Sequence, residues 1–278
     1  MGYKVISLDI DGTLTNSQKK ITGETQNRLF EFQENGGKII LASGRPAMGI
    51  KPYADILRLK EYGGYILAYN GGSVIDCKSG KILFESTLPS YVIPEIYEVI
   101  KNYPVGINTY ENDCIIVGNM INKYTELEAK INGMKIQFED NFTDYVNFPV
   151  NKCLLHGEPD VILELENILS EKYKNRLGVF KSEAFFLEIV PQNIDKAESI
   201  DKLLKLTGYK TEECIACGDG FNDISMIRYA GLGVAMSNAK EPVKAAADYI
   251  TLSNDEDGIA HLLMKIKHHT FPFVKTQV

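Results

Sequence analysis

The chain has 278 residues, of which 44% are hydrophobic and 24% charged, and its net charge is -7. This length allows one large or two modest domains of ordinary globular composition. The acidic balance, with no Lys/Arg run, argues against a nucleic acid or a membrane surface as partner. No apolar run approaches the roughly 20 residues of a membrane span. The amino terminus lacks a signal-peptide layout, so we expect a cytoplasmic protein.

Strand and helix patterns alternate over the first 85 residues. An apolar strand over residues 4–9 precedes a helix over residues 24–37, and a second apolar strand covers residues 38–43. The next helix spans residues 46–59, and short strands at 64–69 and 73–76 flank a turn at Asn70-Gly71-Gly72. Such alternation predicts a parallel sheet.

The regular alternation of strand and helix patterns stops after residue 85 and resumes near residue 190. The later part has helix patterns at 196–206, 222–231 and 241–247 between apolar strands at 213–219 and 233–236. We therefore predict an α/β protein with a Rossmann-like parallel-sheet core made of residues 1–85 and 190–278. Residues 86–189 are predicted to form an inserted α/β cap domain, and the tail from residue 268 lacks periodicity and is predicted to be loose.

The cysteines and histidines of this chain do not indicate a redox-active or zinc site. Of the five cysteines, only Cys214 and Cys217 have a CxxC spacing, and they lie in an apolar strand without a second pair. We interpret them as small core residues. No two histidines form a ligand pair near the candidate site, which makes zinc a poor match.

Acidic residues follow two of the predicted strands. Asp9 ends the first strand, and Asp11 lies two positions on, where an extended backbone sends both side chains the same way. Asp219, Asn222 and Asp223 follow the strand at 213–219. Each segment alone is an ordinary turn composition. Together, however, carboxylates converging from two strand ends suit Mg²⁺, which prefers hard oxygen ligands.

Groups suited to binding phosphate occur at two further element ends. Ser43 and Gly44, followed by Arg45, end the second strand and begin a helix, where hydroxyl and backbone N–H groups can hold phosphate oxygens. Lys196, in the first turn of a later helix, is the candidate cation.

These four segments, in this order, resemble the motifs of the haloacid dehalogenase superfamily. The matching residues are Asp9-Ile10-Asp11-Gly12-Thr13, Ser43-Gly44-Arg45, Lys196, and Asp219 with Asn222-Asp223. The long insertion between Ser43 and Lys196 resembles the cap of the Cof-type subfamily of sugar-phosphate phosphatases. One departure is Ala197, because that subfamily commonly has glycine after the motif lysine.

The resemblance implies a Mg²⁺-dependent phosphatase that hydrolyses small phosphate monoesters, with sugar phosphates preferred. Asp9 is then the nucleophile, which forms an aspartyl-phosphate, and Asp11 is the general acid and base. The implied metal site comprises Asp9, the carbonyl of Asp11, Asp219 and Asp223. The implied phosphate-binding groups are Ile10 N–H, Ser43, Gly44, Lys196 and Asn222, with Arg45 contacting phosphate or substrate.

Two alternatives remain open at this stage. A phosphomutase would transfer the phosphoryl group to a second sugar hydroxyl, although superfamily mutases usually carry their cap between the first two motifs. A catalytically silent regulator with the same fold would bind a ligand without releasing phosphate. The sequence indicates neither the oligomeric state nor the individual ester.

Overall fold

A computed structural model of the chain describes residues 2–267, and these form two compact units. The first unit contains residues up to 44, residues 50–83 and residues from 195 on, whereas the second contains residues 45–49 and 84–194. The predicted α/β class is confirmed. The tail predicted to be loose, residues 268–278, lies outside the described residues.

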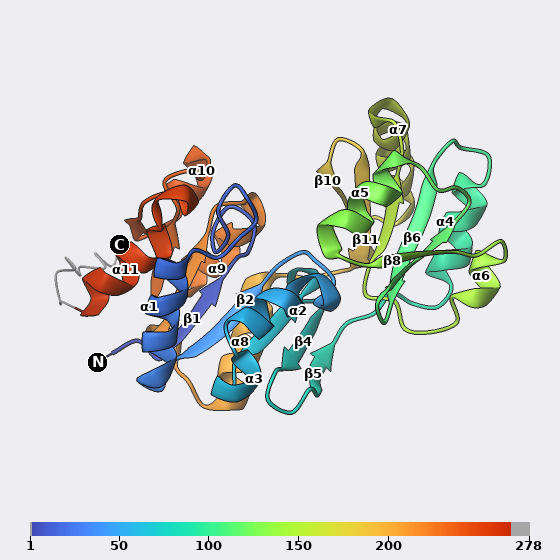
Figure 1. The fold of residues 1–278 in the computed structure, drawn as a ribbon. Helices are drawn as coiled ribbons and strands as arrows, with labels where there is room; N and C mark the ends of the chain where they lie inside the picture. Colours follow the sequence, from blue (N-terminus) through green and yellow to red (C-terminus); the bar gives the residue numbers. More distant parts are fainter. Residues whose placement is uncertain (1, 268–278) are drawn as a thin grey trace. The chain divides into compact units, whose positions relative to one another are not determined.

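The first unit is built on an eight-stranded sheet (Figure 1). In spatial order its strands are β14 (Tyr249–Ile250), β13 (Leu232–Ala235), β12 (Cys214–Gly218), β1 (Val5–Leu8), β2 (Lys38–Ala42), β3 (Tyr65–Ala68), β4 (Ser73–Asp76) and β5 (Ile82–Glu85). The strands from β14 to β3 are parallel, and β4 pairs antiparallel with β3. The direction of winding reverses between β1 and β12, which is where open α/β sheets bind ligands.

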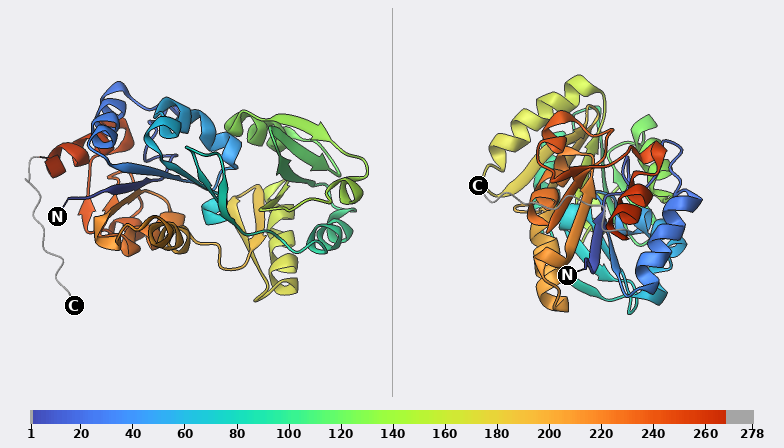
Figure 2. Two further views of the ribbon diagram at one scale, coloured as in Figure 1. Left: turned by 90° about the horizontal axis from the view of Figure 1, so that it is seen from below. Right: turned by 90° about the vertical axis from the view of Figure 1, so that its left-hand side faces the viewer.

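Helices cover both faces of this sheet. Figure 2 shows α1 (Gly23–Glu34), α2 (Ala47–Ile56) and α11 (Gly258–Lys267) on one face, and α8 (Lys196–Thr207) and α9 (Ile224–Tyr229) on the other. Strands covered on both sides are near-continuous runs of hydrophobic residues, and every residue of β1 is buried, with Ser7 its one polar side chain. Two short helices, α3 (Leu59–Tyr62) and α10 (Glu241–Lys244), complete the unit.

The predicted helix over residues 46–59 is shorter in the structure. It ends at Ile56, and α3 begins only after Arg58, whose φ of 55° is left-handed and breaks the helix. The predicted core placement of Cys214 and Cys217 is confirmed, because both lie fully buried in β12.

The second unit has its own six-stranded sheet. Its order is β10 (Leu177–Glu183), β11 (Phe186–Pro191), β9 (Cys153–His156), β6 (Gly106–Glu111), β7 (Cys114–Gly118) and β8 (Lys135–Phe138). On one face α4 (Val92–Ile100) and α7 (Pro159–Lys172) share a core with Ile116, and on the other α5 (Lys123–Asn132) packs over Ile115 and Val117. Successive residues of β7 thus fill different cores, as the two-residue period of a strand requires.

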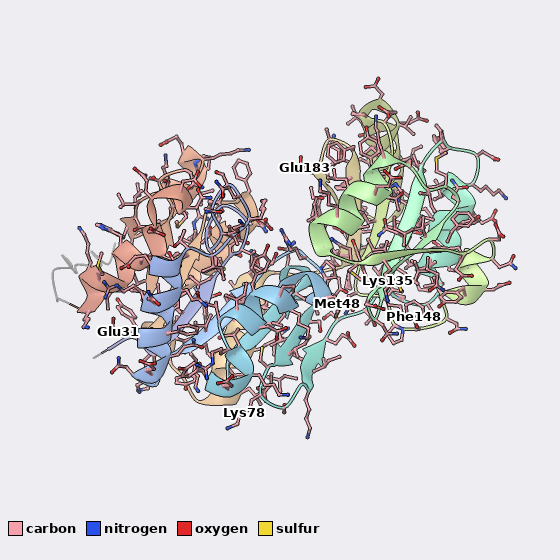
Figure 3. All side chains as sticks on the ribbon, in the orientation of Figure 1. Glu31, Met48, Lys78, Lys135, Phe148 and Glu183 are labelled. Carbon is pink, nitrogen blue, oxygen red and sulfur yellow. The ribbon has the colours of Figure 1, made fainter. Side chains whose placement is uncertain are left out.

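Polar side chains lie on the outside of each unit. Lys78, in the turn between β4 and β5, and Glu183, at the end of β10, are both exposed (Figure 3). The short helix α6 (Phe142–Tyr145) closes the second unit's core with Phe142. Among residues 2–267 no helix has the length and apolar character required to cross a membrane.

Gly233 of β13 is a position where packing forbids a side chain. A Cβ there would lie 2.0 Å from the carbonyl oxygen of Ile227 in α9, so strand and helix would have to separate. We expect Gly233→Ala to destabilise the protein by about 1–3 kcal/mol. Gly23→Ala is the matched control, because a Cβ there meets nothing within 4 Å. Equal urea midpoints for the two variants would contradict this packing.

Candidate active site

Asp9 follows the last residue of β1 and is buried with 7% of its surface exposed. Its backbone N–H donates to the carbonyl of Cys217 at 3.0 Å, which joins the ends of β1 and β12. The chain then turns back sharply at Gly12, whose φ is +83°. A Cβ on Gly12 would lie 2.4 Å from an Asp219 carboxylate oxygen, so only glycine allows the two segments to approach this closely.

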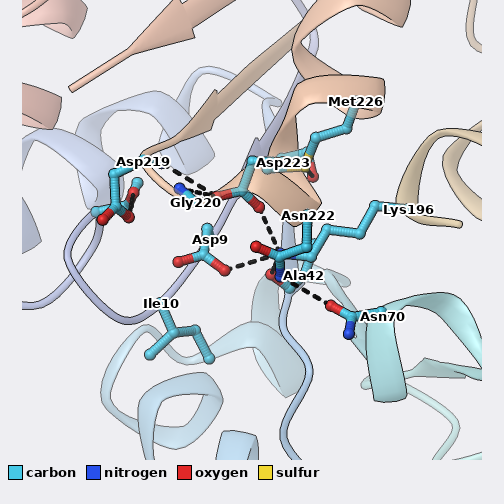
Figure 4. A network of polar contacts seen from close by, with 12 residues as sticks. Asp9, Ile10, Ala42, Asn70, Lys196, Asp219, Gly220, Asn222, Asp223 and Met226 are labelled. Atoms are coloured by element: carbon cyan, nitrogen blue, oxygen red, sulfur yellow. Dashed lines mark hydrogen bonds and ion pairs between the residues drawn. The ribbon is translucent and has the colours of Figure 1, made fainter. Parts of the chain in front are cut away.

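Lys196 is the first residue of α8 and is almost fully buried. Asp195 caps this helix by accepting hydrogen bonds from the N–H groups of Ala197 and Glu198. The Lys196 ammonium donates to Asp9 Oδ1 at 2.7 Å, to Asp223 Oδ1 at 2.6 Å and to the carbonyl of Ala42 at 2.9 Å (Figure 4). All three donor positions of the ammonium are therefore used by acceptors from three separate segments.

The loop after β12 holds two further carboxylates. Asp223 Oδ2 accepts from the N–H groups of Asp219 at 3.1 Å and Gly220 at 2.9 Å. Asp219 Oδ1 accepts from the hydroxyl of Thr13 at 2.8 Å. These bonds fix both carboxylates beside Asp9, and Figure 4 shows the three residues around a common centre.

Burial dominates the electrostatics of this cluster. Desolvation raises the pKa of Asp9 to about 8, and the charge of Asp223 adds to the rise while Lys196 opposes it. Desolvation likewise raises the pKa of Asp219 to about 6, against the hydrogen bond from Thr13. For Lys196, desolvation alone would lower the pKa, but the charges of Asp223 and Asp9 outweigh it and the pKa is raised. The lysine is therefore a permanent cation in a site with excess negative charge.

The donor set fits a hard divalent cation. Asp9, Asp219 and Asp223 each offer a carboxylate oxygen, and these oxygens lie within 4.8 Å of one another. Within the described part of the chain this is the one group of three or more acidic, histidine or cysteine side chains so placed. Carboxylate oxygens from a few residues, completed by water, are the usual environment of Mg²⁺.

The other predicted site residues have different surroundings. Ser43 is buried at the end of β2, where its N–H donates to the Leu67 carbonyl. Asn222 donates its side-chain amide to Asn70 at 3.0 Å. The predicted proton carrier, Asp11, is partly exposed and forms an ion pair with Lys19 at 2.7 Å.

The remaining three predicted residues are Ile10, Gly44 and Arg45. The Ile10 side chain is fully buried, and its carbonyl accepts from the N–H of Thr15. Gly44 follows Ser43 and approaches the Asn70 side chain. Arg45 belongs to the second unit, where its guanidinium donates to the Ile131 carbonyl at 2.9 Å.

Two contributing residues were not identified as site residues in the sequence. Thr13 lies inside the first motif, and its hydroxyl binds the Asp219 carboxylate. Its place two residues beyond Asp11 is the feature of the sequence that could have identified it. Asn70 follows β3, which is parallel to the strands β1, β2 and β12 that precede the other site residues. Its place after a strand end could have identified it, as it identified Asp9.

Comparisons of the sequence and of the structure with known proteins point to the same family. A family model described as haloacid dehalogenase-like hydrolase matches residues 6–263. A crystal structure of a haloacid dehalogenase-like hydrolase from Bacteroides thetaiotaomicron is 47% identical, with a TM-score of 0.92, and the match covers 95% of this chain and 99% of that one.

Two more distant relatives have names that state an activity. The 5-amino-6-(5-phospho-D-ribitylamino)uracil phosphatase YcsE of Bacillus subtilis is 28% identical, over 92% of this chain and 93% of its own length. The structure of a sugar phosphatase of subclass IIB is 27% identical, with a TM-score of 0.77, over 96% of this chain and 99% of that one.

Removing the Lys196 ammonium tests whether this charge stabilises the buried carboxylates of Asp9 and Asp223. In Lys196→Met, the buried carboxylates of Asp9 and Asp223 lose their counterion, and we expect a loss of about 3–5 kcal/mol in metal-free stability. The pKa of Asp9 is already above its unfolded value. At this carboxyl the folded state therefore binds more protons than the unfolded state, and the contribution of Asp9 to stability falls as pH rises from about 4 to 8. The loss in Lys196→Met should accordingly be larger at pH 8 than at pH 5.5.

Lys202→Met is the control for this experiment, since Lys202 lies on the same helix, is exposed and pairs with Glu198 only at 4.0 Å. It should change stability by less than about 0.5 kcal/mol. Urea unfolding of both variants at the two pH values gives the measurement. A Lys196→Met variant with wild-type stability at pH 8 would show that the cluster is not held by this charge.

Proposed function

The chain belongs to the haloacid dehalogenase-like hydrolases, and we propose that it is a Mg²⁺-dependent phosphatase of sugar or sugar-alcohol monophosphates that acts through an aspartyl-phosphate on Asp9. Its place among these hydrolases, several of whose members are named phosphatases, makes it an enzyme of the phosphatase type. The metal, the covalent intermediate and the substrate class are the proposed parts. The observation that carries them is the buried contact of Lys196 with Asp9, beside Asp219 and Asp223.

Asp9 is the nucleophile in this proposal. Its carboxylate oxygen attacks phosphorus, the bond from phosphorus to the ester oxygen breaks, and the phosphoryl group is transferred to Asp9. Lys196 stays charged throughout and stabilises the negative charge of the phosphoryl oxygens, which is the main demand of this transition state. Ser43, Gly44 and Asn222 are assigned to the same oxygens.

Asp11 carries the proton in both half-reactions. It first donates a proton to the departing alcohol oxygen, and it then accepts one from the water that attacks the phosphorus of the aspartyl-phosphate. The bond from phosphorus to Asp9 then breaks and inorganic phosphate leaves. The partial exposure of Asp11 suits a group that must meet both an alcohol and water.

Mg²⁺ would be held by Asp9, Asp219 and Asp223 with the backbone carbonyl of Asp11. When bound, it supplies the positive charge that keeps Asp9 ionised and neutralises the phosphate. Without that charge, burial keeps the pKa of Asp9 near 8. The three carboxylates within 4.8 Å of one another support this assignment.

The proposed substrate class is supported by the relatives. The named substrate of one is a phosphorylated ribityl compound, and another is named as a sugar phosphatase. A ribityl chain and a sugar are both polyhydroxylated carbon compounds. The second unit, residues 84–194 with 45–49, is proposed as the cap that selects the ester.

Replacing the nucleophile is the direct test. Asp9→Asn should lower phosphate release from a panel of pentose, hexose and alditol phosphates by about 10⁴-fold or more, because no carboxylate remains to attack. Acid quenching with ³²P-labelled ester should leave label on wild-type protein and none on the variant. Asp55→Asn, at an exposed helix position, is the control and should keep wild-type activity.

Full activity in Asp9→Asn would refute the covalent mechanism. Wild-type protein that releases no phosphate from any ester in Mg²⁺ would instead revive the silent regulator. Label transferred to a second sugar hydroxyl rather than to water would identify a mutase.

Metal binding should depend on pH in a defined direction. The raised pKa values of Asp9, about 8, and Asp219, about 6, mean that protons compete with Mg²⁺ for these oxygens. Affinity for Mg²⁺ should therefore rise from pH 6 to pH 8, by up to about tenfold per pH unit for each proton displaced, and level off above. Calorimetric titration of chelator-treated protein in buffers of different ionisation enthalpy measures both affinity and proton release. Constant affinity over this interval would argue against metal binding by these carboxylates.

A further inference from the structure

The turn that follows β3 has an unusual backbone. Tyr69 and Asn70 have φ values of 53° and 56°, so two consecutive residues other than glycine lie in the left-handed region. This region is uncommon for residues with a side chain, and especially so for a bulky one such as tyrosine. Such conformations persist only where surrounding contacts hold them, and they concentrate at functional sites.

Asn70 contacts two of the segments assigned to phosphate binding. Its backbone N–H donates to the carbonyl of Ser43 at 2.9 Å, and its side-chain Oδ1 accepts from the amide of Asn222 at 3.0 Å (Figure 4). Gly44 lies so close that a Cβ there would be 3.1 Å from Asn70 Nδ2. The strained residue therefore contacts both the residues that follow β2 and the loop that follows β12.

The next residue contacts the segment around the buried lysine. Gly71 has a φ of +107°, and a Cβ on it would lie 2.8 Å from the carbonyl of Asp195 and 2.4 Å from Ser199 Oγ. The Ser199 hydroxyl donates to the Gly71 carbonyl at 3.0 Å. Asp195 caps α8 immediately before Lys196, so this turn packs against the helix end that presents the ammonium.

We propose that Asn70 is a positioning residue that orients the Asn222 amide and aligns Ser43 and Gly44 with it. This inference rests on the proposed function, in which those groups hold the phosphoryl oxygens. Asn222 is exposed, and an exposed amide otherwise rotates freely. Because one of its two amide hydrogens bonds to Asn70, the plane of the amide is fixed and the second hydrogen has a defined direction.

The first test removes the Asn70 amide without disturbing its backbone. Asn70→Gly keeps a residue that adopts positive φ readily. We expect kcat/KM to fall on the order of tenfold. The loss should be equal for aryl and alkyl phosphates, because Asn222 contacts the phosphoryl group that they share. Asn175→Gly is the control, since Asn175 has a φ of 60° in an exposed turn, and it should keep wild-type activity.

A double-mutant cycle separates positioning from a general structural effect. If Asn70 acts through Asn222, then Asn222→Ala costs much less activity in the Asn70→Gly background than in wild type. Asn70→Asp keeps an acceptor oxygen and tolerates positive φ, so in its background Asn222→Ala should regain its full cost. If Asn70→Gly does not fold, Asn70→Ala, which also lacks the amide, replaces it in the cycle. Fully multiplicative effects in both backgrounds, or wild-type activity of Asn70→Gly, would overturn the inference.

Binding of inorganic phosphate keeps this test independent of turnover. Calorimetric titration with phosphate in the presence of Mg²⁺ should show weaker binding to Asn70→Gly than to wild type, with Asn175→Gly unchanged. An inactive wild-type protein that still shows this pattern would refute the proposed phosphatase function and support the role of Asn70. Equal phosphate affinity of Asn70→Gly and wild type would refute the role of Asn70 and leave the proposed phosphatase function intact.

Discussion

The ion pairs of Lys196 are the constraint on which the first unit depends. Its ammonium is buried, and Asp9, Asp223 and one backbone carbonyl replace the water that it loses on folding. A buried ammonium without such partners would be strongly destabilising. The fold must therefore bring together the end of β1, the loop after β12 and the start of α8, which are far apart in the chain. Any arrangement that satisfies the lysine also assembles the acidic cluster.

Parallel topology makes this assembly possible. Adjacent parallel strands end at the same edge of the sheet, and the reversal of winding between β1 and β12 opens a crevice there. The carbonyl of Cys217 accepts from the N–H of Asp9, which extends the strand pairing to the last residue before the loops diverge. Gly12 then allows the first loop to lie against the Asp219 carboxylate. The site is thus a consequence of strand order together with a few residues that permit close approach.

The positions of the strand ends were predictable because an apolar run that stops at a polar residue marks where a buried strand leaves the sheet. This reasoning located Asp9, Ser43 and Asp219, and the family resemblance added their roles. The partners of flexible side chains were not predictable, since the pairing of Asp11 with Lys19 depends on how a loop folds back. For Asn70 the sequence indicates only a turn residue, because Asn-Gly favours turns for local reasons and its partner Asn222 lies 152 positions away.

The charge balance explains why this cluster suits phosphoryl transfer. Three carboxylates face one ammonium, so the metal-free site favours a proton on Asp9, whose pKa burial and Asp223 raise. The proposed nucleophile must be ionised, however, and a phosphate ester would bring further negative charge into the same space. Lys196 cannot offset both, since its charge is already shared between two carboxylates. In the proposed mechanism a divalent cation would resolve the conflict, because it would stabilise the ionised nucleophile and the phosphate together. In that mechanism, burial of the acidic group, which is unfavourable for the protein alone, strengthens the interaction of the ionised carboxylates with a bound cation, because less water screens their charges.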